Sequence, residues 1–255
     1  MKIVTLITDF GSADPYVPAM KGVILSYSVN VHLVDISHDV PAQDVLAGRL
    51  ILGDAWKFYP PGSIHLGVVD PGVGTARLPL IIEADGHIFV GPDNGLFGFT
   101  RTCRQKKFWA IRGDLMSFMS PTFAGRDLFA HVVGKLVASS SVKKLGSPLT
   151  DIKDLAIAEP KKEKKGFQGE VIYIDRFGNL ITNILKSDTL VNPAVEVGRR
   201  TIRSMVHTYG AAKDGTLLAL WNSSNRLEIA VRNGSAARRL RARRGLKVLI
   251  REAKS

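Results

Sequence analysis

The 255-residue sequence predicts an α/β protein of two domains, in which an amino-terminal α/β domain with a largely parallel sheet precedes a smaller carboxy-terminal all-β barrel or sandwich. Two observations predict this fold class. In the first half, short apolar runs alternate with stretches of helical periodicity, which is typical of a sheet covered by helices on both faces. In the second half, short strands follow one another between clusters of Gly, Asn and Ser, and no long helical pattern interrupts them.

The elements of the first half are assigned from their periodicity. Compact runs of β-branched and other apolar residues predict strands at residues 3–8, 31–36, 64–69, 79–84 and 87–90. Apolar side chains that recur on one side predict helices at residues 15–27, 43–58 and 126–137. Asp9 and Asp70 directly follow two of the strands. Ligands of such sheets bind beyond the carboxyl ends of the strands, so both aspartates are candidates for a site.

The second half predicts a separate domain, with strands at residues 169–174, 217–221, 227–231 and 247–251. The segment before them, residues 160–166, is charged, begins with proline and contains no apolar side chain. We therefore expect it to link a first domain of residues 1–159 to a second domain of residues 167–255.

Composition narrows the class of protein. With 45% hydrophobic and 23% charged residues, the chain is typical of a globular protein. No apolar run approaches the ~20 residues that span a bilayer. The first residues lack the apolar core of a secretory signal. The one cysteine, Cys103, cannot form an internal disulfide. These features predict a cytoplasmic protein with no membrane partner.

The formal net charge of +12 raises the question of a nucleic-acid partner. Basic residues concentrate at residues 161–165 and 238–251, and neither segment carries the interleaved aromatic residues of a base-stacking surface. The composition therefore favours a solvated basic face over nucleic-acid binding.

Polar residues follow predicted strands or precede a predicted helix in four segments. They are residues 8–14 (TDFGSAD), 70–77 (DPGVGTAR), 91–95 (GPDNG) and 123–127 (FAGRD). An ionised aspartate at a strand end can accept hydrogen bonds from the two hydroxyls of a ribose. Aspartate beside glycine or proline is also ordinary turn chemistry, which is the simpler interpretation of any one segment. Four such segments in one half of the chain favour a binding site.

Taken in order, these segments and others resemble the SAM hydroxide adenosyltransferases, which hydrolyse S-adenosyl-L-methionine (SAM) to adenosine and are related to the fluorinase and chlorinase enzymes. The resemblance runs nearly end to end. Its motifs are TDFG at 8–11, DISHDVP at 35–41, VVDPGVG at 68–74, GPDNGLF at 91–97, TFAGRDLFA at 122–130, IDRFGNLITN at 174–183 and NSSNRLEIAVRNGSAA at 222–237. Each motif is weak alone, and their ordered series is specific.

The resemblance implies how the substrate is bound. It implies a homotrimer in which SAM lies between the first domain of one subunit and the second domain of a neighbour, with no metal and no organic cofactor. It assigns the ribose hydroxyls to Asp9 and places the methionine and ribose portions near the turn that begins at Asp175. The adenine would be held by Tyr209 and the backbone around Val231–Asn233. The full set of expected substrate-binding residues is Asp9, Asp14, Asp175, Phe177, Asn179, Tyr209, Asn222, Ser223, Val231 and Asn233. For the turn at 175–179, the alternative interpretation is a plain hairpin turn.

The resemblance also implies the chemistry, in which water or hydroxide attacks C5′ of the ribose and releases L-methionine. We expect Asp70 to orient and partly deprotonate this water, and Arg77 to stabilise the charged carboxylate and the hydroxide character. Placing the nucleophile can supply ~7–11 kcal/mol of the barrier. The alternative interpretation of Asp70 and Arg77 is a structural salt bridge.

Ala124 departs from the family pattern. Hydrolases of the family generally carry TFHGRD here, with a histidine that activates water together with the Asp and the Arg. A methyl group cannot transfer a proton, and losing a general base costs about 10²–10⁴ in rate. Either turnover is impaired at Ala124, or Asp70 and Arg77 suffice.

Three other functions stay open. One is a non-catalytic SAM-binding protein, which Ala124 favours. Another is a SAM-dependent chlorinase, although halogenases of the family carry Tyr at the position of Asp70 and a carboxylate repels halide. The third is a metal-dependent hydrolase with Asp9, Asp14, Asp70 and Asp93 as oxygen ligands.

Overall fold

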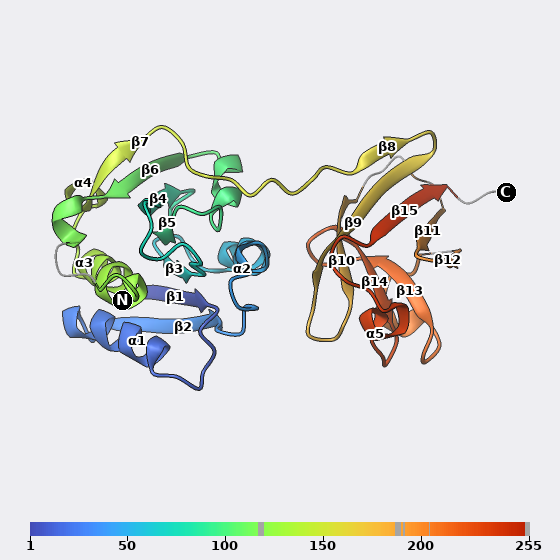
Figure 1. The fold of residues 1–255 in the computed structure, drawn as a ribbon, viewed down its shortest axis with the longest axis horizontal. Coiled ribbons are helices and arrows are strands. Elements are labelled where there is room, and N and C mark those ends of the chain that lie inside the picture. Colours follow the sequence, from blue (N-terminus) through green and yellow to red (C-terminus); the bar gives the residue numbers. More distant parts are fainter. Residues whose placement is uncertain (117–119, 187–189, 191, 204, 253–255) are drawn as a thin grey trace. The chain divides into compact units, whose positions relative to one another are not determined.

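The computed structural model describes residues 1–116, 120–186, 190, 192–203 and 205–252. The chain divides into two compact units, Met1–Leu155 and Ala156–Ser255 (Figure 1). Each unit has its own sheet and its own hydrophobic core, and the two are described separately.

The first unit is built on one mixed sheet. Within the described residues it has seven strands in the order β2-β1-β3-β5-β4-β6-β7. The strands are β1 (Lys2–Thr8), β2 (Val31–Ser37), β3 (Ile64–Val68), β4 (Pro79–Ala84), β5 (His87–Pro92), β6 (Lys106–Ile111) and β7 (Gly146–Leu149). The pairs from β2 to β5 are parallel, and the pairs from β5 to β7 are antiparallel.

The prediction of a largely parallel sheet is therefore wrong. Only Asp85 and Gly86 connect β4 to β5, and both have positive φ, at 45° and 84°. A two-residue turn of this kind forces antiparallel pairing, whereas parallel pairing needs a crossover of a dozen residues or more. The hairpin therefore ends the parallel part of the sheet.

Helices pack on the sheet where the apolar periodicity predicts them. α1 (Tyr16–Tyr27) and α3 (His131–Val137) share one buried core with alternate residues of β1 and β3. A π-helical turn, η4 (Gly125–Ala130), precedes α3 and corresponds to the first part of the helix predicted at 126–137. α2 (Val45–Ala55) contacts β1 and β2. The shorter helical segments are η1 (Trp56–Phe58), η2 (Gly98–Thr102), η3 (Gly113–Met116) and α4 (Val142–Leu145).

The second unit is an antiparallel, barrel-like sheet, in agreement with the prediction. Its described strands follow the order β12-β11-β15-β9-β10-β14-β13, and β8 pairs with β9. They are β8 (Lys161–Glu163), β9 (Gly166–Ile174), β10 (Leu180–Leu185), β11 (Pro193–Val197), β12 (Arg200–Ile202), β13 (Leu217–Trp221), β14 (Arg226–Val231) and β15 (Lys247–Glu252). The end strands β12 and β13 contact each other, so the sheet nearly closes. The short helices η5 (Tyr209–Ala211) and α5 (Ala236–Leu240) complete the unit.

The segment 160–166, which we expected to link the domains, contains β8 and the turn into β9, and Lys161 pairs with Gln168. The boundary between the compact units falls after Leu155. Among the described residues, no helix has the length and apolar character needed to cross a membrane.

Candidate active site

Asp70 and Arg77 form a buried ion pair at the end of β3. Arg77 Nε donates to Asp70 Oδ1 at 2.8 Å, and Arg77 Nη2 donates to Asp70 Oδ2. The side chains of Asp70 and Arg77 are only 5% and 9% exposed. The guanidinium also lies over the ring of Phe129, with its carbon 5.3 Å from the ring centroid. Two parallel hydrogen bonds fix the plane of the carboxylate, so Asp70 presents its oxygens in one orientation.

A tight loop brings the two partners together across seven positions of sequence. Asp70 O accepts a hydrogen bond from Val73 N at 3.2 Å, which closes a turn directly after the strand. Gly74 then has φ +77°, and a side-chain carbon there would lie 2.9 Å from Pro121 O. The loop thus requires glycine at this position and packs against the segment before η4.

Ala124 lies in this packed region. It is 1% exposed and belongs to the apolar core of the unit. Its neighbour Gly125 lies next to β3, because a side-chain carbon there would be in ordinary van der Waals contact with Val68 Cγ1, at 3.5 Å. The segment therefore adjoins the end of β3, which leads to Asp70. The methyl group of Ala124 can neither donate nor accept a proton there.

Asp9 follows β1 at the same edge of the sheet. Its Oδ2 accepts a hydrogen bond from Gln43 N at 2.7 Å, so one oxygen ties the loop to the start of the segment before α2. The loop is also held by Gly11 N, which donates to His38 O at 2.8 Å. Asp14 lies further along the loop and is exposed.

An aromatic cluster that the sequence did not predict joins two of these segments. Phe10, Tyr16 and Phe123 contact one another with ring centroids 5.2–5.9 Å apart. The loop after β1 and the segment before η4 therefore meet, and the loop that carries Asp70 and Gly74 packs on that same segment. The first unit thus gathers these three polar segments at one edge, and the fourth, residues 91–95, reaches the same edge through the bond from Asn94 Nδ2 to Val69 O at 2.8 Å.

In the second unit, an open pocket of about 620 Å³ gathers most of the predicted substrate-binding residues. Its volume lies in the range of sites for small organic ligands. Two aromatic side chains, Phe177 and Tyr209, are 76% and 46% exposed. The lining residues are Asp175, Phe177, Asn179, Tyr209, Gly210, Val231, Arg232, Asn233 and Gly234.

Asp175 organises the turn between β9 and β10. Its Oδ1 accepts from Phe177 N at 2.9 Å and from Asn179 N at 2.8 Å, and its Oδ2 accepts from Asn179 Nδ2 at 2.9 Å. Gly178 has φ +84° and abuts Ser235. The hairpin-turn interpretation and the binding interpretation are thus compatible, because the same turn lines the pocket.

A buried carboxylate lies behind Tyr209. Tyr209 Oη donates to Glu228 Oε1 at 2.6 Å, and Glu228 is 3% exposed. Burial and the nearby charge of Asp175 raise the pKa of Glu228, and the hydrogen bonds from Tyr209 and Asn222 act against that rise. Burial and the bond to Glu228 raise the pKa of Tyr209. The phenol is therefore a neutral hydrogen-bond donor with a fixed direction.

Arg232 holds the loop that carries Tyr209. Its Nη1 donates to Gly210 O at 2.7 Å and to Ala212 O, and its Nε lies 2.8 Å from Asp214 Oδ1. Sequence reasoning assigned no role to the side chain of Glu228 or of Arg232. The signal for Glu228 was a lone carboxylate inside the apolar strand RLEIAV.

Asn222 and Ser223 do not line this pocket. They lie in the turn between β13 and β14, where Asn222 Oδ1 accepts from Ser224 N and Arg226 N at 3.0 Å. Ser223 is exposed.

The aspartates considered for a metal site do not gather. Across the part of the chain that the structure describes, no group of three or more His, Cys, Asp or Glu residues is placed to hold a metal ion.

The fold and these sites define a protein with an α/β domain and a barrel-like β domain, each presenting candidate ligand-binding residues. Family models for the N-terminal and C-terminal domains of SAM hydroxide adenosyltransferase match residues 4–146 and 169–249. The chain belongs to the SAM hydroxide adenosyltransferase family.

Individual relatives agree with this assignment. The chain is 34% identical to an (R)-S-adenosyl-L-methionine hydrolase of Thermus thermophilus, over 98% of this chain and 100% of the relative. It is 34% identical to a hydrolase of the same name from Salinispora tropica, over 92% of each chain. A fluorinase of Actinoplanes is 26% identical, over 73% of this chain and 72% of the fluorinase. A solved structure of a conserved protein from Thermotoga maritima superimposes with a TM-score of 0.88 at 30% identity, covering 98% of this chain and 100% of that one.

Proposed function

We propose that this protein hydrolyses SAM to adenosine and L-methionine. The observation that carries the proposal is the buried, bidentate Asp70–Arg77 pair at the carboxyl end of β3. Such a pair presents a carboxylate of fixed orientation where a water molecule can be held and polarised. The (R)-S-adenosyl-L-methionine hydrolases to which the chain is similar support the choice of substrate.

In the proposed reaction, water oxygen forms a bond to C5′ of the ribose while the C5′–S bond breaks. The electron pair of that bond goes to sulfur, which leaves as the neutral thioether of methionine. Asp70 orients the water and accepts its proton as the new C–O bond forms, and the proton then passes to solvent. Arg77 holds the Asp70 carboxylate in place. No metal or organic cofactor takes part in this scheme.

We propose that the pocket of the second unit binds the nucleoside and methionine portions. The exposed ring of Tyr209 offers a face for adenine, and the backbone at Val231 and Asn233 offers hydrogen-bonding groups to its edge. Asp9 binds the ribose hydroxyls. In keeping with the family resemblance, the site is completed between subunits of a homotrimer, in the cytoplasm.

Ala124 supports a second candidate, a protein that binds SAM with little turnover. The segment offers a buried methyl group where the resemblance expects an imidazole, so Asp70 is the one proposed proton acceptor. The chlorinase alternative is disfavoured because a carboxylate repels halide beside the reacting carbon.

The deciding experiment measures SAM affinity and product formation on the same preparation. Chromatography should show equal amounts of adenosine and methionine from the full-length protein, and Asp70→Asn should suppress both without abolishing SAM binding. Binding without products in the unaltered protein would establish the non-catalytic alternative. A halogenated nucleoside formed at high chloride would establish the chlorinase.

A further inference from the structure

The loop at residues 91–95 contacts the backbone on both sides of the Asp70–Arg77 pair. Asn94 Nδ2 donates to Val69 O at 2.8 Å, directly before Asp70. Asp93 N donates to Leu78 O at 2.8 Å, directly after Arg77. The residues that flank the Asp70–Arg77 loop, Val69 and Leu78, therefore both accept hydrogen bonds from the 91–95 loop.

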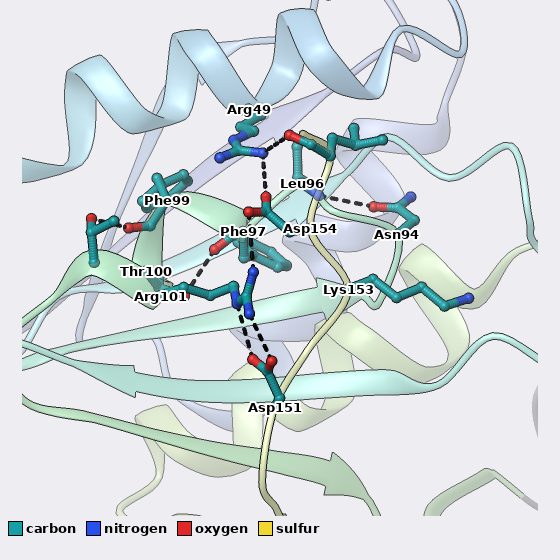
Figure 2. Close-up of polar contacts among 12 residues, drawn as sticks. Arg49, Asn94, Leu96, Phe97, Phe99, Thr100, Arg101, Asp151, Lys153 and Asp154 are labelled. Carbon is teal, nitrogen blue, oxygen red and sulfur yellow. Dashed lines mark hydrogen bonds and ion pairs between the residues drawn. The ribbon is translucent and has the colours of Figure 1, made fainter. Parts of the chain in front are cut away.

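The Asn94 side chain is itself oriented. Its Oδ1 accepts a hydrogen bond from Leu96 N at 3.2 Å, an interaction that Figure 2 draws. With the amide oxygen used in this way, the amide nitrogen faces Val69 O. The loop also lies very close to β3, because a side-chain carbon at Gly91 would come within 2.1 Å of Gly67 O. Asn94 is therefore held at a fixed distance from β3, both by its own bond to Val69 O and by the close approach of Gly91 in β5 to Gly67 in β3.

The same loop is fastened to the last residues of the first unit. Asp93 is 6% exposed and its Oδ1 accepts from Lys153 N at 2.8 Å. Figure 2 shows the neighbouring contacts of this segment, in which Arg101 pairs with Asp151 and Asp154 and Arg49 donates to Asp154 and to Leu155 O. The shortest Arg101–Asp151 contact is 2.7 Å. The bond from Lys153 N to Asp93 thus joins the loop to residues 151–155, whereas the two arginines contact residues 151–155 and not the loop itself.

We propose that Asn94 is a positioning residue for Asp70, and that the 91–95 loop sets the placement of the proposed catalytic pair. This inference rests on the proposed hydrolysis. An ion pair fixes Asp70 relative to Arg77 but not relative to the sheet, whereas the bonds to Val69 O and Leu78 O fix the pair to β5. A misplacement of about 1 Å at a reacting group can cost about 100-fold in rate, so a lost anchor at Val69 is expected to lower kcat.

The test compares two variants of the full-length protein. Asn94→Asp keeps the acceptor for Leu96 N and the size of the side chain but removes the donor to Val69 O. Arg101→Gln is the matched control. It breaks the ion pairs of Arg101 with Asp151 and Asp154, and Arg101 makes no hydrogen bond to Val69 or Leu78. We expect Asn94→Asp to lower kcat about 10-fold or more with KM for SAM changed less than about threefold, and Arg101→Gln to leave both within about twofold.

Amide hydrogen exchange gives a readout that is independent of turnover. Asn94→Asp should speed exchange of the amides at residues 70–77 about tenfold, and Arg101→Gln should leave them unchanged. Unchanged kcat in Asn94→Asp, an equal loss in both variants, or unchanged exchange at 70–77 would each overturn the inference. If the unaltered protein releases no adenosine, the proposed function fails, and the exchange data alone then decide whether Asn94 positions the loop.

Discussion

Replacing Asp70 with asparagine should separate the two roles that the ion pair combines, stability and turnover. The structure leaves Arg77 only 9% exposed, so Asp70→Asn strands a buried guanidinium without its counter-charge. Breaking a buried pair in this way costs about 3–5 kcal/mol. Asparagine still offers one carbonyl oxygen to Arg77 Nε, so we expect a loss of about 3 kcal/mol in the free energy of unfolding. The turnover should fall by about 10²–10⁴ because amide oxygen is a poor proton acceptor.

The double variant Asp70→Asn/Arg77→Gln distinguishes the loss of stability from the loss of turnover. It removes both charges, so it should recover about 1–3 kcal/mol relative to the sum of the single changes. Turnover should stay as low as in Asp70→Asn, because the proton acceptor is still missing. Urea unfolding and the initial rate of adenosine release, measured on all four proteins, check the two outcomes together. Additive stabilities would refute the coupled buried pair, and a double variant with restored turnover would refute the role of Asp70.

Three further perturbations test other parts of the molecule. Ala124→His should raise adenosine release about tenfold while lowering the melting temperature, since a larger side chain enters a position that is 1% exposed. The raised pKa of Glu228 means that the folded protein holds the carboxyl proton more tightly than the unfolded chain does. The free energy of unfolding therefore falls as the pH rises from the ordinary pKa of glutamate through the raised pKa of Glu228. Glu228→Gln cannot ionise, so its melting temperature relative to the unaltered protein should increase from about pH 4 to about pH 8. Burial raises the pKa of Cys103 to about 11, so a thiol reagent at neutral pH should modify Cys103 only after the first unit unfolds.

Each of these has an outcome that contradicts it. For position 124, Ala124→Leu is the control for volume, and equal rates in the leucine and histidine variants would remove the proposed proton-transfer role. A difference between Glu228→Gln and the unaltered protein that stays constant with pH would show that this carboxyl does not titrate differently on folding. Rapid labelling of Cys103 in the folded protein would contradict its burial.

Most element positions could be predicted because they depend on local patterns. The strands at 3–8 and 64–69 appear as β1 and β3 almost residue for residue, since consecutive β-branched and apolar side chains leave little alternative to a buried strand. Strand direction was predicted less well. The information was present in Asp85–Gly86, whose two-residue turn forces antiparallel pairing, but periodicity alone does not reveal which strands pair.

The site shows a similar division. Asp70 and Arg77 could be proposed from sequence because motif order places them, and the structure brings them into a bidentate contact. The burial of Glu228 behind Tyr209 could not be predicted, because it depends on which face of β14 is covered by residues 19 positions away. Asn94 was part of a recognised motif, yet its contact with Val69 spans 25 positions.

The sequence by itself determined the family, the approximate strands and helices, and the residue types available for the chemistry, because each is encoded in short segments. Only the tertiary structure decided the order of the strands in the mixed sheet, the pocket that gathers the turn at Asp175 with Tyr209 and residues 231–234, and the anchoring of residues 69 and 78 to one loop. These depend on contacts between segments far apart in the chain. Such contacts form only where packing and hydrogen bonding together outweigh the entropy of closing the intervening loops.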